Sequence, residues 1–414
     1  MTPARPRIVA FAYDIEPDQG SEPGAGWSGV RMLAGFADVT VVTRRRPPGE
    51  NGTWDDWTSR IPEAGAIHFV NVRLPGDPTW PGNTGRPARW SRQAHFGYMA
   101  WMVVAGRAAR RLHAERPYDL AWHLTWANAW FGSTLATVPA PFVLGPIGGG
   151  VGPPWRLVLA AGPRATAFEI VRAIARDVAR WLNPLARHSW SRARLILVQN
   201  RETLRWLPAS ARGKARVFNN ATVVDSPSRT RLRADADPPV ALFAGRLIGW
   251  KGGHIALKTL AALPGWRLIV CGDGPMRQAL GRLAEELAIA DRVEFRGWQT
   301  RDEVQRVMTK EADALLFPSF HDEAGLTVAE AVAVGLPVVC LDRGGPPVIA
   351  GGGVEPAGER ETVARLARAL TAAVESSPEP RPLDPATRRL ELEGLLRSAG
   401  LLPQEQEEPA AGPA

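Results

Sequence analysis

The chain has few of the residues that mark several classes of protein. Only two of its 414 residues are cysteines, too few to staple a scaffold of this size, so a reducing cytoplasm is the expected compartment. The longest apolar stretch, 96–106, is shorter than the roughly 18 residues that a membrane-spanning helix needs. Residues 8–13 are too short for the core of a signal peptide. We expect a cytoplasmic protein whose contact with membranes is at most peripheral.

Lysine is scarce, and arginine supplies most of the basic character. The chain has 50 Lys and Arg residues against 42 Asp and Glu, a net charge of +8, so an acidic partner must be considered. Zinc-ligand spacing, an RNA-binding signature and a base-reading basic helix are all missing from the sequence. We therefore predict no nucleic-acid partner. Arginines recur on helix-like sequence between 164 and 216, which leaves possible peripheral contact with an anionic membrane open.

The pattern of apolar segments predicts two α/β domains. Apolar strands alternate with helical segments such as 26–36, 92–116 and 168–191, and this rhythm restarts after a polar stretch. The predicted strands are 7–13, 39–43, 67–72, 120–124, 142–144, 195–199, 240–243, 268–271, 293–295, 314–317 and 338–341. Strands separated by helices favour doubly wound parallel sheets. Ligands of such sheets bind beyond the carboxyl ends of the strands, here in a cleft expected between the domains.

Composition also suggests the domain boundaries. We predict a first domain over 1–225, a linker over 226–239 and a second domain over 240–374. The remaining residues, 375–414, would hold one helix at 385–398 and a disordered tail from 403 onward.

Two glycine-rich segments of the second domain follow predicted strands. Arg246 and Lys251 lie five residues apart on the first one, 245–253, and two cations on such a loop can flank a diphosphate. Solvated surface charge is the simpler reading of this loop taken alone. Gly272 and Gly274 lie in the second segment, 270–275, which alone is an ordinary turn.

The segment 321–340 combines a turn, two acidic positions and a short helix. Gly325 suits a sharp turn with positive φ, and residues 326–334 form a helix that Gly335 and Pro337 end. The first N–H groups of such a helix are free to bind a phosphate. Glu330 lies about one helical turn after Thr327, where a carboxylate can accept ribose hydroxyls.

These motifs occur in an order that resembles a known family. The segments at 245–252, 272–275, 293–297 and 330–338 together are similar to family 4 glycosyltransferases, the group 1 transferases with the GT-B fold. The resemblance covers about residues 7–370. It implies two Rossmann-like domains, a nucleotide-sugar donor on the second and an acceptor on the first: a glycan, a lipid-linked compound or a small molecule. It also implies transfer with retention and without a metal or other cofactor.

The resemblance assigns roles to residues of the donor domain. Arg246 and Lys251 would neutralise the diphosphate and stabilise the leaving group, and Glu330 would hold the ribose. Backbone N–H groups around Gly325, Leu326 and Thr327 would contact the phosphates or the sugar. The loops at Gly272 and Gly274 would border the donor, and the loop after Gly297 would face the base.

At one position the chain departs from the family pattern. The first glutamate of the family falls on Asp322, and Glu323 follows it. Either carboxylate can reach the donor sugar, and we favour Asp322.

In the first domain, the resemblance points to two glycine loops and a histidine. Gly24 and Gly26 lie in one predicted loop, and Gly148 and Gly149 in the other. Their backbone amides would meet the donor phosphates or a polar acceptor group. His123 matches a position near the reacting sugar, although a structural histidine is the competing interpretation.

Two other functions are kept as alternatives. Residues 24–29 spell the G-x-G-x-x-G fingerprint of a dinucleotide site, which would suit an NADP-dependent oxidoreductase, but the preceding strand ends too early. A non-catalytic nucleotide-sugar-binding or scaffold protein on the same fold is the stronger alternative. It is favoured by Asp322 and by a C-terminal end that looks shortened, because many relatives return a long terminal helix to the first domain.

Overall fold

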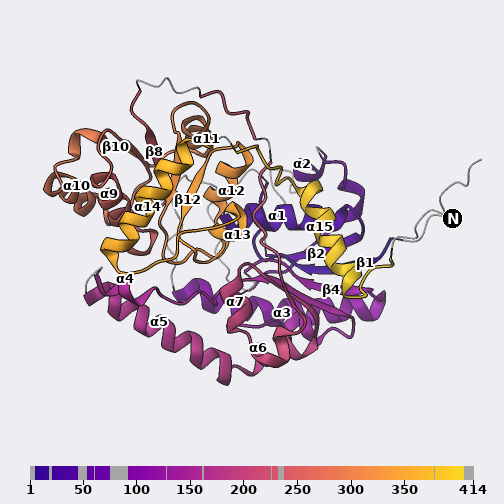
Figure 1. Cartoon of the computed structure of the whole chain (residues 1–414). Coiled ribbons are helices and arrows are strands. Elements are labelled where there is room, and N and C mark those ends of the chain that lie inside the picture. The colour runs from indigo at the N-terminus through magenta and orange to yellow at the C-terminus, as the bar shows by residue number, and fades with distance from the viewer. Residues whose placement is uncertain are drawn as a thin grey trace, which may run out of the picture.

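The computed structural model contains two parallel β-sheets with helices on both faces of each (Figure 1). The structure describes residues 5–17, 21–44, 54–59, 61–74, 92–126, 128–160, 163–224, 226–231, 237–376 and 378–404. Within these residues, no helix is both long and apolar enough to cross a membrane.

The first sheet is built from residues 7–217. Its strands are β1 (Arg7–Phe11), β2 (Asp38–Thr43), β3 (Ile67–Asn71), β4 (Leu120–His123), β5 (Phe142–Ile147), β6 (Ala193–Val198) and β7 (Ala215–Val217). They pair in parallel in the order β3-β2-β1-β4-β5-β6-β7. The helices of this half are α1 (Ser21–Ala34), α2 (Asp55–Thr58), α3 (Arg92–Glu115), α4 (Trp155–Ala160), α5 (Pro163–Leu182), α6 (Pro184–Arg192), α7 (Arg201–Trp206) and α8 (Ala209–Arg212).

The second sheet is built from residues 240–340. Its strands are β8 (Val240–Ala244), β9 (Arg267–Cys271), β10 (Val293–Gly297), β11 (Ala314–Phe317) and β12 (Val338–Cys340). All pairings are parallel, in the order β10-β9-β8-β11-β12. The helices are α9 (Gly253–Ala261), α10 (Arg277–Glu286), α11 (Arg301–Lys310), α12 (Leu326–Ala333), α13 (Pro346–Ala350), α14 (Glu359–Val374) and α15 (Pro385–Ser398). The prediction of two doubly wound parallel sheets is confirmed.

Buried apolar side chains fill both faces of each sheet. Four core clusters result, two for each sheet, as expected for parallel sheets that are covered on both sides. Packing on both faces therefore holds the strands in place. The loops that follow their carboxyl ends start from fixed positions.

Three local predictions were wrong. The short strand β7 was missed, since three residues are too few to show an apolar period. The predicted helix 168–191 is two helices, because Asn183 accepts hydrogen bonds from the N–H groups of Leu185 and Ala186 and so starts α6. The glycine loop predicted at 20–27 is mostly helix, since α1 begins at Ser21.

Two segments pack across the predicted domain boundaries. Leu157 and Val158 of α4 belong to a core cluster of the second sheet. Leu392 and Leu396 of α15 belong to a cluster of the first sheet, against α1 (Figure 1). The expected shortening of the terminal helix therefore does not prevent its return to the first half. The boundaries themselves stay a prediction, and residues 232–236 of the linker and 405–414 of the tail lie outside the described residues.

Packing of α15 on the first sheet predicts unequal effects of two leucine substitutions. Leu396→Ala removes a fully buried side chain and should lower the free energy of unfolding by about 2–4 kcal/mol. Leu390→Ala, on the exposed side of the same helix, should lower it by less than about 0.5 kcal/mol. Urea unfolding monitored by circular dichroism measures both. Equal effects would contradict the docking of α15.

Candidate functional site

The glycine loops of the second half meet at the carboxyl edge of its sheet. The N–H of Leu247 donates to the carbonyl of Asp273 at 2.9 Å, and the N–H of Gly272 donates to the carbonyl of Gly297 at 2.7 Å. A Cβ on Gly272 would lie 1.9 Å from the carbonyl oxygen of Gly245. Only glycine allows this approach, so three loops from β8, β9 and β10 form one backbone surface.

Gly274 has a similar steric role in this surface. Its φ is +157°, and a Cβ there would lie 2.6 Å from the carbonyl oxygen of Leu247. The predicted glycines at 272, 274 and 297 are thus brought together, by loops that follow adjacent strands.

The turn at 321–325 lies beside this surface, at the switch point of the second sheet. The strand order reverses between β8 and β11, and ligands of doubly wound sheets bind outside the strands at that point. Gly325 has φ +77°, as predicted, and a Cβ would lie 3.1 Å from the backbone nitrogen of Pro346. Helix α12 then starts at Leu326, so the first N–H groups of the helix, including that of Thr327, have no acceptor within it.

Lys251 and Asp322 form an ion pair across the switch point. The Nζ of Lys251 donates to Oδ2 of Asp322, and the N–H of Gly325 donates to Oδ1 at 3.0 Å. Burial alone would raise the pKa of Asp322, but the charge and hydrogen bond of Lys251, with the Gly325 N–H, hold it below its usual value. Asp322 is therefore ionised at neutral pH.

The Glu323 side chain points away from Lys251 and accepts hydrogen bonds from residues of the first half of the chain. Asn200 Nδ2 donates to its Oε2 at 2.7 Å, and the N–H of Gly149 is a further donor. A Cβ on Gly148 would lie 2.9 Å from the Cβ of Glu323. Burial raises the pKa of Glu323 despite these donors. The two acidic neighbours therefore have distinct surroundings, with Asp322 facing the cation and Glu323 facing the glycine loop of β5.

Glu330 is held by Arg301, at the start of α11. Arg301 Nε donates to Glu330 Oε1 at 3.0 Å. Burial raises the pKa of Glu330, and the charge and hydrogen bond of Arg301 oppose this rise only in part. The carboxylate thus lies on α12, one turn beyond the helix start, with an arginine beside it.

Arg246 differs from Lys251 in its surroundings. Its side chain is exposed, and among the described residues no hydrogen bond or ion pair engages its guanidinium. It follows Gly245 at the end of β8, so it projects from the same loop as Lys251.

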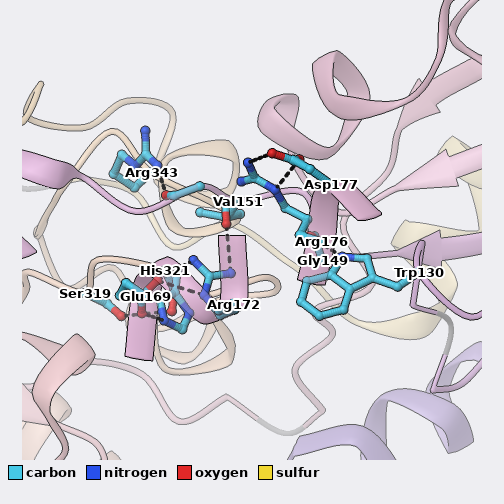
Figure 2. A network of polar contacts seen from close by, with 11 residues as sticks. Trp130, Gly149, Val151, Glu169, Arg172, Arg176, Asp177, Ser319, His321 and Arg343 are labelled. Carbon is cyan, nitrogen blue, oxygen red and sulfur yellow. Dashed lines mark hydrogen bonds and ion pairs between the residues drawn. The ribbon is translucent and has the colours of Figure 1, made fainter. Parts of the chain in front are cut away.

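Helix α5 connects the loops of the two halves beside this site (Figure 2). Glu169 Oε1 lies 3.0 Å from His321 Nε2, and Arg172 Nη1 donates to the carbonyl of Val151 at 3.0 Å. The Trp250 ring stacks between Phe168 and His321, with ring centroids 5.8 Å and 5.2 Å apart. The loops around 151, 250 and 321 are therefore fixed by one helix.

His123 is buried in the first half. Its Nε2 lies 2.9 Å from the hydroxyl of Tyr98 and 3.0 Å from the carbonyl of Thr125, and the residue is 1% exposed. Burial lowers its pKa to about 4, so the ring is neutral near pH 7. These contacts favour the structural interpretation, and its predicted role near the sugar stays untested.

Gly24 and Gly26 do not form the predicted loop, because both lie inside α1. A Cβ on Gly26 would lie 2.6 Å from Thr125 and 2.7 Å from the carbonyl of Asp14. The glycine therefore allows α1 to pack against the ends of β1 and β4. The G-x-G-x-x-G fingerprint of an oxidoreductase is then a helical segment, which lacks the strand-to-helix glycine turn that a dinucleotide site requires.

Sequence reasoning missed Asn200 and Arg301 as members of the site. Asn200 lies two residues after the end of β6 and caps α7 by accepting from the Thr203 N–H. A polar residue just after a buried strand is expected at the carboxyl edge of the sheet, and this signal could have identified Asn200. Arg301 follows the Gly297 loop and begins α11, but its pairing with Glu330 depends on how α11 and α12 pack, which no local pattern reveals.

Comparison with known proteins shows which fold and which family the chain resembles. The fold is GT-B: the lipopolysaccharide outer core galactosyltransferase WaaB, in its apo form, superposes with a TM-score of 0.57 at 14% identity, over 95% of this chain and 99% of that one. Residues 225–390 match the family described as "Glycosyl transferases group 1". This part of the chain is therefore similar in sequence to group 1 glycosyltransferases.

Curated relatives match over a shorter segment. The lipopolysaccharide core biosynthesis glycosyltransferase LpsE of Rhizobium meliloti is 36% identical over 134 residues, which are 32% of this chain and 38% of the relative. The D-inositol 3-phosphate glycosyltransferase of Mycobacterium marinum is 39% identical over 133 residues, 31% of this chain and 28% of the relative. The matched part thus spans well under half the length of these relatives.

The Lys251–Asp322 pair predicts a pH-dependent loss of stability. Lys251→Ala should lower the free energy of unfolding by about 1.5–3 kcal/mol at pH 7, the range for a hydrogen bond to a charged group. Because the folded pKa of Asp322 lies below its unfolded value, the pair stabilises the fold above about pH 4 and this contribution is lost as pH falls through the folded pKa.

Denaturant unfolding of the wild type and the Lys251→Ala variant between pH 3 and 8 measures this difference. Lys258→Ala, which removes a more exposed ion pair with Glu359, is the matched control and should have a smaller effect. A Lys251 effect that is constant down to pH 3 would show that Asp322 is not its partner.

Proposed function

We propose that the protein transfers a sugar from a nucleoside diphosphate sugar to an acceptor hydroxyl, with retention of anomeric configuration and without a metal ion or other cofactor. The observation that carries the proposal is the meeting of Lys251, Asp322 and the start of α12 at the switch point of the second sheet. The family match and the transferase names of its relatives support the same class of reaction.

Charge on the departing diphosphate is the main demand of this reaction. Arg246 and Lys251 would face the phosphates, and the free N–H groups at the start of α12 add further donors. Groups that are already oriented before the bond breaks stabilise the transition state most effectively. In this proposal they replace the charge that a divalent cation supplies in metal-dependent transferases.

The sugar and the ribose would bind to two carboxylates. Asp322 is ionised and can accept hydroxyl hydrogen bonds from the donor sugar while the diphosphate approaches Lys251. Glu330 can accept both ribose hydroxyls, and Arg301 keeps a positive charge beside it. Trp298, which follows Gly297 and is 57% exposed, offers an aromatic face to the base.

The acceptor would approach from the first half of the chain. Gly148 and Gly149 line the loop that faces Glu323, and polar backbone groups of this loop that Glu323 does not engage can orient a polar acceptor group. Held against the anomeric carbon, the acceptor hydroxyl can attack on the face that the diphosphate leaves. Its oxygen then bonds to that carbon as the bond to the diphosphate breaks, and its proton passes to the departing phosphate oxygen.

Arg246→Ala should lower turnover by about 10²–10³-fold, the range seen when one preorganised charge-stabilising donor is removed. Its side chain is exposed, so the fold should be unchanged by circular dichroism. Arg267→Ala is the matched control: this exposed arginine begins β9 and lies at the opposite edge of the sheet. Donor consumption and transfer over a panel of nucleotide sugars and acceptors are the readouts.

If turnover of Arg246→Ala stayed within a factor of two of wild type, the proposed contact of Arg246 with the donor phosphates would be refuted. Donor binding without any transfer or hydrolysis by the wild type would identify the non-catalytic alternative instead.

Retention and metal independence are tested on the product. Proton NMR of the first product formed from an α-linked donor should show an α-linkage. Millimolar EDTA should leave the transfer rate within about twofold of its untreated value, because charge neutralisation comes from Arg246 and Lys251. A β-linked product would refute retention, and a rate that EDTA abolishes and Mg²⁺ restores would refute metal independence.

A further inference from the structure

Helix α5 exposes an apolar face. Its side chains at 170, 171, 174, 178, 181 and 182 follow the spacing of one helical face and are all exposed: Ile170, Val171, Ile174, Val178, Trp181 and Leu182. With Phe168, which is also exposed, seven of the twelve exposed large hydrophobic residues in the described parts of the chain lie on this one helix. Figure 1 shows α5 at the periphery of the molecule, below both sheets.

The polar face of the same helix points into the protein. Glu169 contacts His321 and Arg172 contacts the carbonyl of Val151, while the Arg180 guanidinium lies 5.9 Å from the Trp206 ring centroid. A helix on the surface of a soluble protein has the reverse arrangement, with its apolar stripe toward the core. The outer face of α5 is thus apolar and suits an environment less polar than water.

Positive charge is concentrated in the part of the sequence that carries this helix. Residues 155–216 contain thirteen of the fifty Lys and Arg residues but only three of the forty-two Asp and Glu, a net charge of +10, which leaves −2 for the rest of the chain. Arg187, Arg192 and Arg194, on α6 and just after it, are exposed. A second copy of the chain would bring the same charge and be repelled, whereas an anionic surface would be attracted.

We propose that α5 binds in the plane of an anionic lipid bilayer, with its apolar face among the acyl chains and the arginines of the following segment at the phosphate headgroups. A length of 20 residues corresponds to about 30 Å of helix, and such interfacial helices enter about 5–10 Å into the bilayer. This binding does not depend on the proposed transfer reaction. For that reaction, it would hold the loops at 151 and 321 beside the membrane and so favour a lipid-borne acceptor.

Vesicle co-sedimentation of the full chain tests the proposal. Wild-type protein should bind vesicles containing 30% phosphatidylglycerol, and binding should fall at least tenfold on pure phosphatidylcholine or in 0.5 M NaCl. Ile174→Glu should weaken binding to the anionic vesicles at least tenfold. Leu390→Glu is the matched control, because it places the same charge on an exposed apolar position of α15 (58% and 63% exposed, respectively) and should bind like wild type.

A second measurement does not depend on the folding of a charged variant. Brominated acyl chains should quench part of the tryptophan fluorescence of the wild type, and Trp181→Phe should lose most of that quenching. Equal binding of the Ile174→Glu and Leu390→Glu variants, or equal quenching with and without Trp181, would overturn the proposal. So would a wild-type dimer in sedimentation velocity that Ile174→Glu converts to a monomer, since the face would then be a subunit interface.

Discussion

Two adjacent carboxylates at the switch point must both find hydrogen-bond donors, and the site depends on how they do so. A buried carboxylate without donors is costly. Asp322 takes its donors from Lys251 and the Gly325 N–H, within the second half. Glu323 takes its donor from Asn200, on the first half. The turn is thereby tied to both parts of the chain, and the loop of β5 lies against the start of α12.

The glycines of the site serve this arrangement by allowing backbones to approach. Gly148 lets Glu323 reach the first half, and Gly272 lets the loops after β8 and β9 pack together. Neither position has room for a Cβ atom. The resulting surface consists largely of backbone amides, with the cations of one loop beside it. Such a surface is suited to a diphosphate, because the glycines leave room for a close approach and Lys251 is held in place before the ligand binds.

Features with a local signal were predicted well from the sequence. All strands except β7, the turn at Gly325 and the helix at 385–398 follow from apolar period, turn residues and helix-ending residues within a few positions. The Glu323–Asn200 contact joins residues 123 positions apart, so nothing local reveals it. Residues 24–29 show the opposite case. They match the G-x-G-x-x-G pattern of a dinucleotide site, but they lie within helix α1 and not at a strand-to-helix turn.

Helix α5 shows a third limit. The sequence predicts a helical segment at 168–191, but its periodicity does not state which face points inward. Only the contacts of Glu169 and Arg172 show that the polar face does. The same contacts fix the loops beside Asp322, so the helix that carries the exposed face also supports the candidate site.

The central claim is that the switch point of the second sheet binds a nucleoside diphosphate, and thermal unfolding with added nucleotides tests it most directly. One of UDP, GDP, ADP or TDP at about 100 times its Kd should raise Tm by roughly 3–5 °C, because a ligand that binds only the folded state stabilises it by mass action. The matching nucleoside should give no shift, and Lys251→Ala should remove most of it. A nucleoside shift equal to that of its diphosphate, or a full shift in Lys251→Ala, would contradict the account.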